Sequence, residues 1–444
     1  MQKSHNASRR VERKDSMIRI LNAEEMPIKE ILLRRDVLPD VSGAVSEILA
    51  EVCTHGDRAL LSYTQKFDGA ALTALELTRA ERDEALKKVD PVFLSVLEEA
   101  AGNIRAYHRK QLRSGYVMSE REGIVLGQRI LPLAKVGLYV PGGTASYPST
   151  VLMDAIPAKL AGVGELVMTT PPSGDGQISP NLVAAAEIAG VDRIFCCGGA
   201  QAIAALAYGT ETIPQVDKIV GPGNVYVAEA KRQVFGRVAI DMIAGPSEIL
   251  AIADEDNDPV VVAADLLSQA EHDKMAAAVL ITTSAKLAGA VADELERQLK
   301  NLPREAIARS SIENNGKIIL VESVDEAIDI ANAIAPEHLE LLVSEPFSYL
   351  CRIQNAGSVF LGRNCPEPLG DYFAGTNHTL PTGGTARFSS PLGVDDFVKK
   401  SSFMYYSADA LGTVGEKIAL FAETEGLHAH AVSAVIRSKE GDEK

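Results

Sequence analysis

The sequence predicts an α/β protein of two doubly wound, Rossmann-like domains with parallel sheets, flanked by small helical N- and C-terminal appendages. Short apolar runs alternate with Ala-rich helical segments between Gly137 and Asp254, and a second series of the same kind follows. Repeated units of this length indicate parallel strands joined by right-handed helical crossovers. The 444 residues also exceed the roughly 250–300 that one hydrophobic core supports, which favours more than one domain.

The N-terminal part of the chain is predicted to be helical. Residues 1–16 carry charges of both signs without the apolar core of a signal peptide, and we interpret them as a mobile extension, with a transit peptide as the alternative. From about Asp36 to Lys110, apolar residues recur at helical spacing. We assign these helices to the first Rossmann-like domain, which then comprises residues 17–135 and 248–390.

The strands delimit the two domains. The second domain, residues 136–247, is predicted from strands at Val136–Val140, Glu165–Thr169, Arg193–Cys196 and Lys218–Val220, with helices near Thr150–Leu160, Asn181–Ala189, Ala200–Ala207 and Val225–Val234. The first domain takes strands Glu248–Ala253, Ala277–Thr282, Lys317–Val321, Leu339–Val343 and Ser358–Leu361, with helices Asp258–Glu271, Ala285–Leu299 and Val324–Ala333. Beyond Pro391 the spacing is helical again, so residues 391–444 are predicted to form a helical appendage.

Composition excludes several classes of protein. The net charge of -16 would repel phosphate backbones, which argues against a nucleic-acid partner. No apolar run approaches the roughly 18 residues of a membrane helix, so no membrane association is predicted. The five cysteines form neither a disulfide framework nor a C-x-x-C pattern, which indicates a cytoplasmic protein. Cys196 and Cys197 end an apolar run, and we interpret them as strand packing rather than redox groups.

Glycine-rich loops follow three strands of the second domain. They are Pro141-Gly142-Gly143-Thr144, Gly198-Gly199-Ala200-Gln201 and Gly221-Pro222-Gly223-Asn224. Open α/β sheets bind ligands at the carboxyl ends of their strands, and each loop opens a helix whose first amides could hold a phosphate. The third loop approaches G-x-G-x-x-G, but Tyr226 replaces the last glycine. On the motif alone, a nucleotide site and ordinary turn-forming glycines are both open.

Polar residues in the C-terminal half form a candidate metal cluster. Gln269 and His272 stand three apart on a predicted helix, so both side chains share one face and could chelate an ion; a solvated helix end is the alternative. Asp371 and His378 lie in a polar, glycine-rich stretch, where residues usually serve function rather than packing. His430 ends the segment Glu425-Gly426-Leu427-His428-Ala429-His430 near the C-terminus.

Glu337 and His338 form a candidate acid–base pair. The segment Ala335-Pro336-Glu337-His338 places a carboxylate beside an imidazole directly before a predicted strand. Proton transfer near neutral pH needs groups of this kind, and histidine requires the smallest pKa adjustment. A surface turn after Pro336 is the alternative.

At these residues the sequence resembles the histidinol dehydrogenase family. The resemblance extends from about residue 20 to residue 437, and the matching segments are Val136–Pro148, Gly199–Gly209, Gly221–Asn224, Gly245–Glu248, Asp265–His272, Ala335–Leu339, Gly370–Pro381 and Glu425–His430. It implies a cytoplasmic enzyme that oxidises L-histidinol to L-histidine through L-histidinal, in the last steps of histidine biosynthesis. Two NAD+ are used per turnover.

The resemblance also implies roles for residues. One zinc ion per subunit would be held by Gln269, His272 and Asp371 together with His430 of the partner subunit, so that the site is shared in a homodimer. The C-terminal appendage would reach that partner. Positions that contact the substrate are Ser247, Gln269, His272, His338, Asp371, Glu425 and His430. Tyr139, Gln201 and Asn224 match positions that contact NAD, which makes residues 136–247 the NAD side and the first domain the zinc and substrate side.

Glu337 and His338 match the family's proton-transfer pair. His338 would accept the alcohol proton and later a second proton, and Glu337 would help water attack the aldehyde. His428 falls at a variable position, so His430 is the expected ligand. The alternatives are a relative that oxidises another small alcohol, a zinc hydrolase in which Glu337 activates water, and a silent binding paralogue. The complete set of ligand and proton-transfer positions argues against the last.

Overall fold

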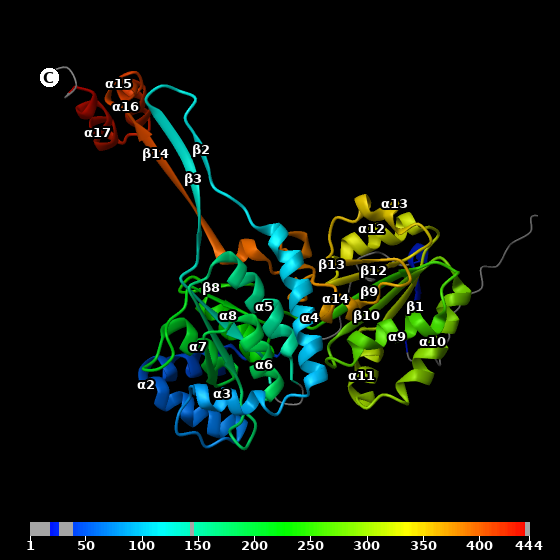
Figure 1. Cartoon of the computed structure of the whole chain (residues 1–444). Helices are drawn as coiled ribbons and strands as arrows, with labels where there is room; N and C mark the ends of the chain where they lie inside the picture. The colour runs from blue at the N-terminus through cyan, green and yellow to red at the C-terminus, as the bar shows by residue number, and fades with distance from the viewer. Residues whose placement is uncertain (1–17, 26–38, 143–145, 440–444) are drawn as a thin grey trace, which may run out of the picture.

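The computed structural model describes residues 18–25, 39–142 and 146–439. The predicted mobile extension, residues 1–16, lies outside these ranges. The described chain forms two α/β bodies side by side and a long arm that projects away from them (Figure 1). Within the described ranges, no helix has the length and apolar character needed to span a bilayer.

The first α/β body contains a six-stranded parallel sheet in the order β1-β11-β10-β9-β12-β13. Its strands are β1 (Arg19–Asn22), β9 (Glu248–Ala253), β10 (Ala277–Thr282), β11 (Lys317–Leu320), β12 (His338–Leu342) and β13 (Ser358–Leu361). The helices between them are α9 (Pro259–Ala270), α10 (Ala285–Leu299), α11 (Glu305–Asn315), α12 (Val324–Ile334) and α13 (Pro346–Tyr349). We call this body the first domain.

Helices cover both faces of this sheet. Alternate residues of β9, such as Ile249 and Ala251, pack in one core with α9, α10 and α11, while Leu250 and Ile252 pack in a second core with α12. A strand buried on both faces needs an almost continuous apolar run, which is why these strands were visible in the sequence. The predicted doubly wound architecture is confirmed here.

The second α/β body contains a five-stranded parallel sheet in the order β6-β5-β4-β7-β8. Its strands are β4 (Lys135–Tyr139), β5 (Glu165–Thr170), β6 (Arg193–Cys196), β7 (Lys218–Val220) and β8 (Ala239–Ile240). The helices between them are α5 (Pro148–Ala161), α6 (Pro180–Ala189), α7 (Gly199–Tyr208) and α8 (Val225–Val234). We call this body the second domain.

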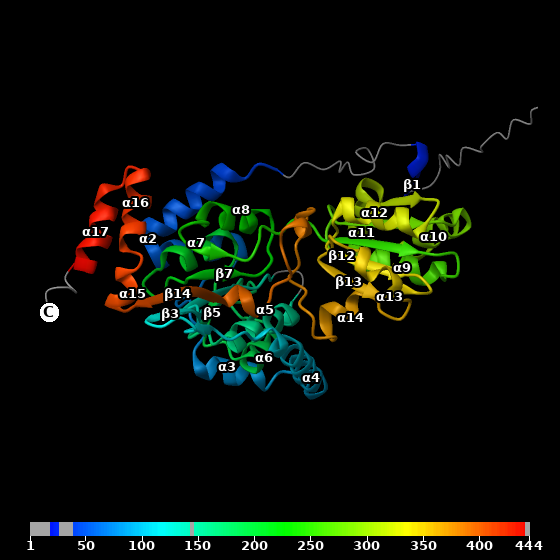
Figure 2. The ribbon, with the colours of Figure 1, turned by 90° about the horizontal axis from the view of Figure 1, so that it is seen from above.

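The N-terminal helices belong to the second domain, which corrects their predicted assignment to the first. They are α2 (Ser42–Asp68), α3 (Arg79–Leu86) and α4 (Pro91–His108). Apolar residues of α2 share a core with α7 and α8, and those of α4 share the opposite core with α5 and α6 (Figure 2). Strand β1 and the 3-10 turn that follows it (Ala23–Glu25) are the described N-terminal elements that do belong to the first domain. Amphipathic spacing predicted the helices, but it carries no information about which sheet they cover.

The C-terminal appendage is an arm of mixed structure rather than a helical one. Its base is a three-stranded antiparallel sheet of β2 (Tyr116–Met118), β3 (Ile124–Pro132) and β14 (Val398–Tyr406). Its tip holds helices α15 (Ala408–Gly412), α16 (Gly415–Thr424) and α17 (His428–Lys439). The run Val398–Tyr406 pairs with β3 over nine residues, a long-range partner that helical spacing could not reveal.

The segment after helix α14 (Glu367–Tyr372) packs against the second domain. Helix α14 belongs to the first domain, and the residues that follow it pack on α5 of the second. The Nδ2 of Asn377 donates to the carbonyl oxygen of Met153 at 2.7 Å, and the hydroxyl of Thr379 donates to Oδ1 of Asp154 at 2.9 Å. We call residues 377–379 the domain latch.

Candidate active site

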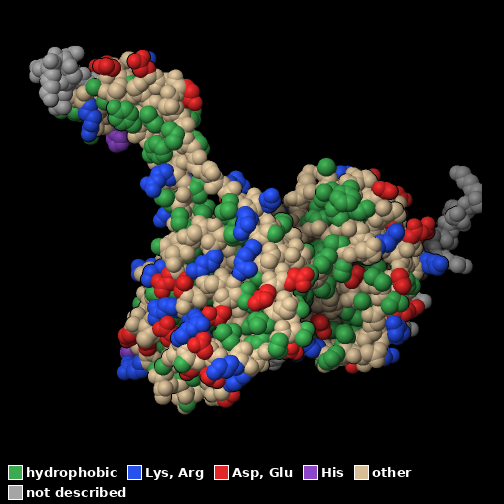
Figure 3. All heavy atoms as spheres, viewed as in Figure 1, with side chains coloured by type: hydrophobic (Ala, Val, Ile, Leu, Met, Phe, Trp, Pro, Cys, Tyr) green, Lys and Arg blue, Asp and Glu red, His purple; other side chains and the backbone are tan. Residues whose placement is uncertain are grey.

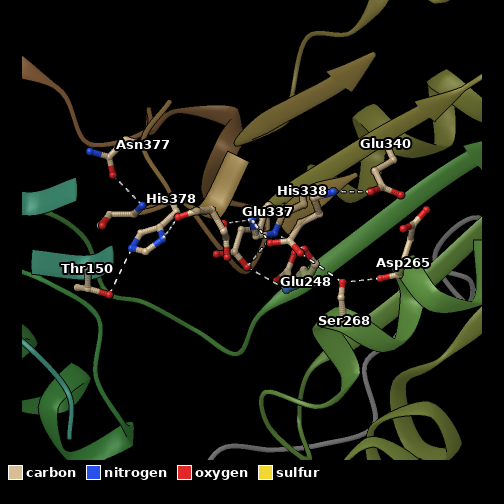
Figure 4. Close-up of polar contacts among 12 residues, drawn as sticks. Thr150, Glu248, Asp265, Ser268, Glu337, His338, Glu340, Asn377 and His378 are labelled. Carbon is tan, nitrogen blue, oxygen red and sulfur yellow. Dashed lines mark hydrogen bonds and ion pairs between the residues drawn. The ribbon is translucent and has the colours of Figure 1, made fainter. Parts of the chain in front are cut away.

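The predicted acid–base pair lies at the amino edge of the first domain's sheet. His338 begins β12, and Glu248 begins the neighbouring strand β9, in register with residue 337. Figure 4 shows Glu337, His338 and Glu248 together at these strand starts. Ligands of open α/β sheets usually bind at the carboxyl edge, so this placement departs from the common pattern.

Two hydrogen bonds from the Glu248 backbone fix the pair. The Nδ1 of His338 lies 2.9 Å from the carbonyl oxygen of Glu248, which can only accept, so Nδ1 carries the proton. The backbone N–H of Glu248 donates to Oε2 of Glu337 at 2.9 Å. Nε2 is therefore the ring nitrogen of His338 that gains or loses a proton, and both side chains are held in one orientation.

A group of metal-binding side chains surrounds Nε2 of His338. That atom lies 3.6 Å from Oδ1 of Asp371 and 3.7 Å from Oε1 of Glu367. The three residues can offer ligand atoms within 4.8 Å of one another. His338 Nε2, Glu367 Oε1 and the nearby Gln269 Nε2 are buried without a hydrogen-bond partner among the described residues. Buried polar atoms are normally satisfied, so this group has unused capacity for a ligand.

Gln269 and His272 approach this group from the C-terminal end of α9. Gln269 lies in the last turn of the helix and is 1% exposed. Burial lowers the pKa of His272, while the carboxylate of Asp371 raises it and the imidazole of His338 lowers it. His272 therefore lies near Asp371 and His338, and Gln269 interacts with Glu367, so both flank the group of His338, Glu367 and Asp371, which is the set that could offer ligand atoms to one ion.

Burial and mutual charge shift the pKa values of the site. Burial raises the pKa of Glu337 to about 8 against the opposing charge of His338. Burial alone would lower the pKa of His338, but the carboxylates of Glu337, Asp371 and Glu367 raise it to about 10. Burial likewise opposes ionisation of Asp371, yet the imidazoles of His338 and His378 lower its pKa to about 2. Perturbations of this size are typical of functional sites.

Three buried carboxyl groups near the site were missed in the sequence. Glu367 is 2% exposed and accepts a hydrogen bond from Ser268 at 3.2 Å. Glu340 is fully buried, accepts the backbone N–H of Glu367 at 2.8 Å and interacts with Asp265. One signal was available, because Glu367 and Asp371 are four residues apart and so share a helical face. Glu340 within an apolar strand was a second.

The predicted NAD residues lie at the carboxyl edge of the second domain's sheet. Tyr139 ends β4 and is buried, and its hydroxyl oxygen accepts the backbone N–H of Gly199 at 3.2 Å. Gln201 is buried in the first turn of α7. Asn224 is the N-cap of α8, and its side chain accepts from the N–H groups of Tyr226 and Val227. The three residues thus sit on three strand-end loops of one edge, as the crossover topology requires.

The remaining predicted substrate residues are divided between body and arm. Ser247 directly precedes β9 and the Glu248 backbone of the site. Glu425 and His430 are exposed at the tip of the arm, around Gly426 at the start of α17. The arm points away from the body of its own chain (Figures 1 and 3). Within one chain, therefore, neither residue joins the cluster of Gln269, His272 and Asp371.

Two histidines had no assigned role. His378 belongs to the domain latch, where its Nδ1 donates to the carbonyl oxygen of Asp371 at 3.1 Å and its Nε2 lies 3.3 Å from the hydroxyl of Thr150. It therefore links the strand-end helix α5 to the helix that bears Asp371. His428 is exposed and pairs through Nδ1 with Glu423, 2.5 Å away.

The adjacent cysteines are packing residues, as predicted. Cys196 is 4% exposed at the end of β6, and Cys197 is fully buried beside it. Burial raises the pKa of Cys196 to about 12 and that of Cys197 well above its usual value. A thiol that stays protonated is a poor nucleophile. Burial and a raised pKa therefore favour packing over a nucleophilic role for both cysteines.

A doubly wound parallel sheet with glycine-rich strand-end loops, beside a buried group of carboxylates and an imidazole that could hold a metal ion, is typical of nucleotide-binding α/β enzymes. The family model for histidinol dehydrogenase matches residues 34–438. The chain belongs to the histidinol dehydrogenase family. It is an oxidoreductase of histidine biosynthesis, and the family implies NAD-linked oxidation of histidinol with use of a metal.

Individual relatives support the assignment over nearly the whole chain. Histidinol dehydrogenase of Clostridium acetobutylicum is 55% identical over 90% of this chain and 93% of its own length. The protein of that name from Listeria monocytogenes is 56% identical with the same coverage. The crystal structure of histidinol dehydrogenase from Elizabethkingia anophelis superposes with a TM-score of 0.91 at 38% identity, and covers 96% of this chain and 99% of the other.

Proposed function

We propose that this enzyme carries out the zinc-dependent, four-electron oxidation of L-histidinol to L-histidine through L-histidinal, with two NAD+ per turnover. The observation that carries the proposal is the buried Glu337–His338 pair beside the ligand group of His338, Glu367 and Asp371. Two successive oxidations need a group that accepts a proton in each step and a group that prepares water for the second. The pair supplies one of each.

The residues present fit a metal ion. Gln269, His272 and Asp371 provide an amide, an imidazole and a carboxylate, and buried polar atoms around them lack partners among the described residues. We propose that these three, with His430 of the partner subunit, hold zinc. A bound zinc would orient the substrate through its nitrogens and polarise its oxygen. Imidazole and oxygen ligands suit zinc, as well as manganese or cobalt.

His338 is the proposed proton acceptor in both oxidations. Its Nδ1–H is fixed on the Glu248 carbonyl, so only Nε2 can take the alcohol proton. Bound NAD+ would supply the hydride acceptor of each step. In the second step, after His338 has released the first proton to solvent, Glu337 accepts a proton from water as it adds to the aldehyde, and His338 accepts the hydroxyl proton of the resulting hydrate. Because burial raises the pKa of Glu337 to about 8, its carboxylate is basic enough for this task.

Tyr139, Gln201 and Asn224 are the proposed contacts of NAD. Their positions at three neighbouring loops of the carboxyl edge support this role, because a nucleotide bound there would span the loops. The proposed substrate contacts are the ligands Gln269, His272, Asp371 and His430, together with His338, Ser247 and Glu425. Glu425 would then come from the partner subunit together with its His430.

The arm supports the proposed homodimer. The arm exposes large apolar side chains, including Leu420 at 71% and Phe421 at 70% exposure at its tip and Met404 at 72% on strand β14 of its base. Hydrophobic atoms gather on the arm's visible face (Figure 3). Exposed apolar surface of this kind indicates a protein interface, and the partner proposed here is a second copy of the chain. A cytoplasmic location remains a prediction.

Product stoichiometry tests the proposal. Zinc-loaded protein should form two NADH for each L-histidinol consumed, and chelation should abolish the reaction until zinc is restored. Glu337→Gln should slow the aldehyde oxidation more than the alcohol oxidation, while Ala292→Gly, a buried change on α10, should leave the stoichiometry unchanged. The absence of NADH would refute the function, and one NADH per substrate would refute the two-step reaction.

A further inference from the structure

A buried ion pair lies directly behind the loop Gly221–Asn224 of the second domain. Lys231 on α8 contacts Asp241, which follows β8, and the two side chains are 2% and 1% exposed. Such a pair is unusual in the interior, because the desolvation of both charges opposes burial. Neither residue takes part in the proton or metal chemistry proposed above.

The ion pair holds both backbone polar groups of Gly221. The Nζ of Lys231 donates to the carbonyl oxygen of Gly221 at 2.9 Å. The backbone N–H of Gly221 donates to Oδ2 of Asp241 at 2.8 Å. The loop is therefore fixed at its first residue by the pair, and at its last residue by the Asn224 cap of α8.

Gly221 also lies against the end of strand β4. Its φ of +113° is a conformation that side chains rarely adopt, and a Cβ placed on it would stand 2.0 Å from the carbonyl oxygen of Tyr139. The hydroxyl oxygen of the same tyrosine accepts the N–H of Gly199, at the start of the helix that bears Gln201. Through Tyr139, the position of Gly221 is thus coupled to the start of the helix that bears Gln201.

We propose that the Lys231–Asp241 pair positions the Gly221–Asn224 loop for binding of NAD. This inference rests on the proposed function, since it takes Tyr139, Gln201 and Asn224 as the NAD contacts. Lys231 and Asp241 are positioning residues, which reach the nucleotide only through the backbone of Gly221. The two opposite charges offset one another. Because both are buried away from solvent, water cannot replace their hydrogen bonds to Gly221, and the loop keeps its position.

Nucleotide affinity tests the proposal. Lys231→Met removes the donor to Gly221, and the double variant Lys231→Met with Asp241→Asn removes both charges, so that no buried charge is left unpaired. Each should weaken binding of NAD+ to the zinc-loaded enzyme at least tenfold by calorimetry without substrate, while the KM for L-histidinol changes less than twofold. Lys218→Met is the control, because Lys218 is a buried lysine on strand β7 that forms an ion pair with the partly exposed Asp396 at 3.0 Å.

The outcomes separate this inference from the proposed function. A folded double variant that binds NAD+ as tightly as the unmodified enzyme overturns the inference alone, provided the unmodified enzyme oxidises L-histidinol. An equal loss of NAD+ affinity in Lys218→Met also overturns it, because the effect would then be general destabilisation. An unmodified enzyme that binds no NAD+ overturns both proposals.

Discussion

Mixing two inactive variants tests whether the arm of one chain completes the site of another. Glu337→Ala removes a buried side chain from the body, and His430→Ala removes an exposed imidazole from the arm. In a single chain the arm holds His430 away from the cluster of Gln269, His272 and Asp371 (Figure 1). Each pure variant should therefore be almost inactive, and for different reasons.

The arrangement fixes how much activity a mixture regains. Random exchange between equal amounts of the two variants makes about half of the dimers heterodimers. If each site combines one body with the other chain's arm, one site of the heterodimer carries both substitutions and the other carries none. About one quarter of all sites are then intact, so we expect about one quarter of the activity of the unmodified enzyme.

The assay follows NADH formation after subunit exchange, with differently tagged chains to count heterodimers. A mixture of Glu337→Ala and His338→Ala is the matched control, because both substitutions lie in the body and every site stays defective. That mixture should regain nothing. No recovery in the test mixture, with heterodimers demonstrated, would show that His430 acts within its own chain or not at all.

Three further results are expected. The aldehyde oxidation should quicken at least about tenfold between pH 7 and pH 9, because Glu337 ionises through its pKa of about 8 while His338 begins to lose its proton toward its pKa of about 10; Glu337→Gln should show a rise about tenfold smaller, and an equal rise in the variant contradicts the role of Glu337. His272→Ala should weaken zinc binding at least about tenfold in chelator competition, and unchanged affinity would remove it from the ligand set. Burial raises the pKa of Asp154 to about 8, far above its unfolded value, so protonation stabilises the fold at low pH and this stability is lost as pH rises from about 4 to 8. Asp154→Asn should remove that part of the pH dependence of the unfolding free energy, measured by denaturant unfolding. If the unfolding free energy of the variant still falls between about pH 4 and pH 8 as steeply as before, a group other than Asp154 takes up the proton.

Much of the fold could be predicted because the strands are buried on both faces. Strands such as Glu248–Ala253 and Arg193–Cys196 appear in the structure with the predicted bounds, since an apolar run in a parallel sheet needs no partner to be recognised. The long strand Val398–Tyr406 could not be found in this way. Its residues are mostly exposed, and its pairing with β3 joins segments far apart in the sequence.

The residues of the candidate site also fall into those that the sequence revealed and those that it did not. Glu337, His338 and Asp371 stood out by residue type in polar surroundings, and the structure brings them together. Glu340 was hidden in a strand, where a buried carboxylate is unexpected unless its partners are known. The Lys231–Asp241 pair was equally hidden, because its meaning depends on the position of Gly221 in space.

If the enzyme carries out the two proposed oxidations, the domain latch bears on how the nucleotide is exchanged between them. Asn377, His378 and Thr379 each contact α5, and Asn103 of α4 donates to the carbonyl oxygen of Phe373 at 2.9 Å just before them. Opening the domains like a hinge would break all of these contacts at once. We therefore expect spent NADH to leave through small local movements of the strand-end loops, while the two sheets keep their mutual orientation and the half-oxidised substrate stays enclosed.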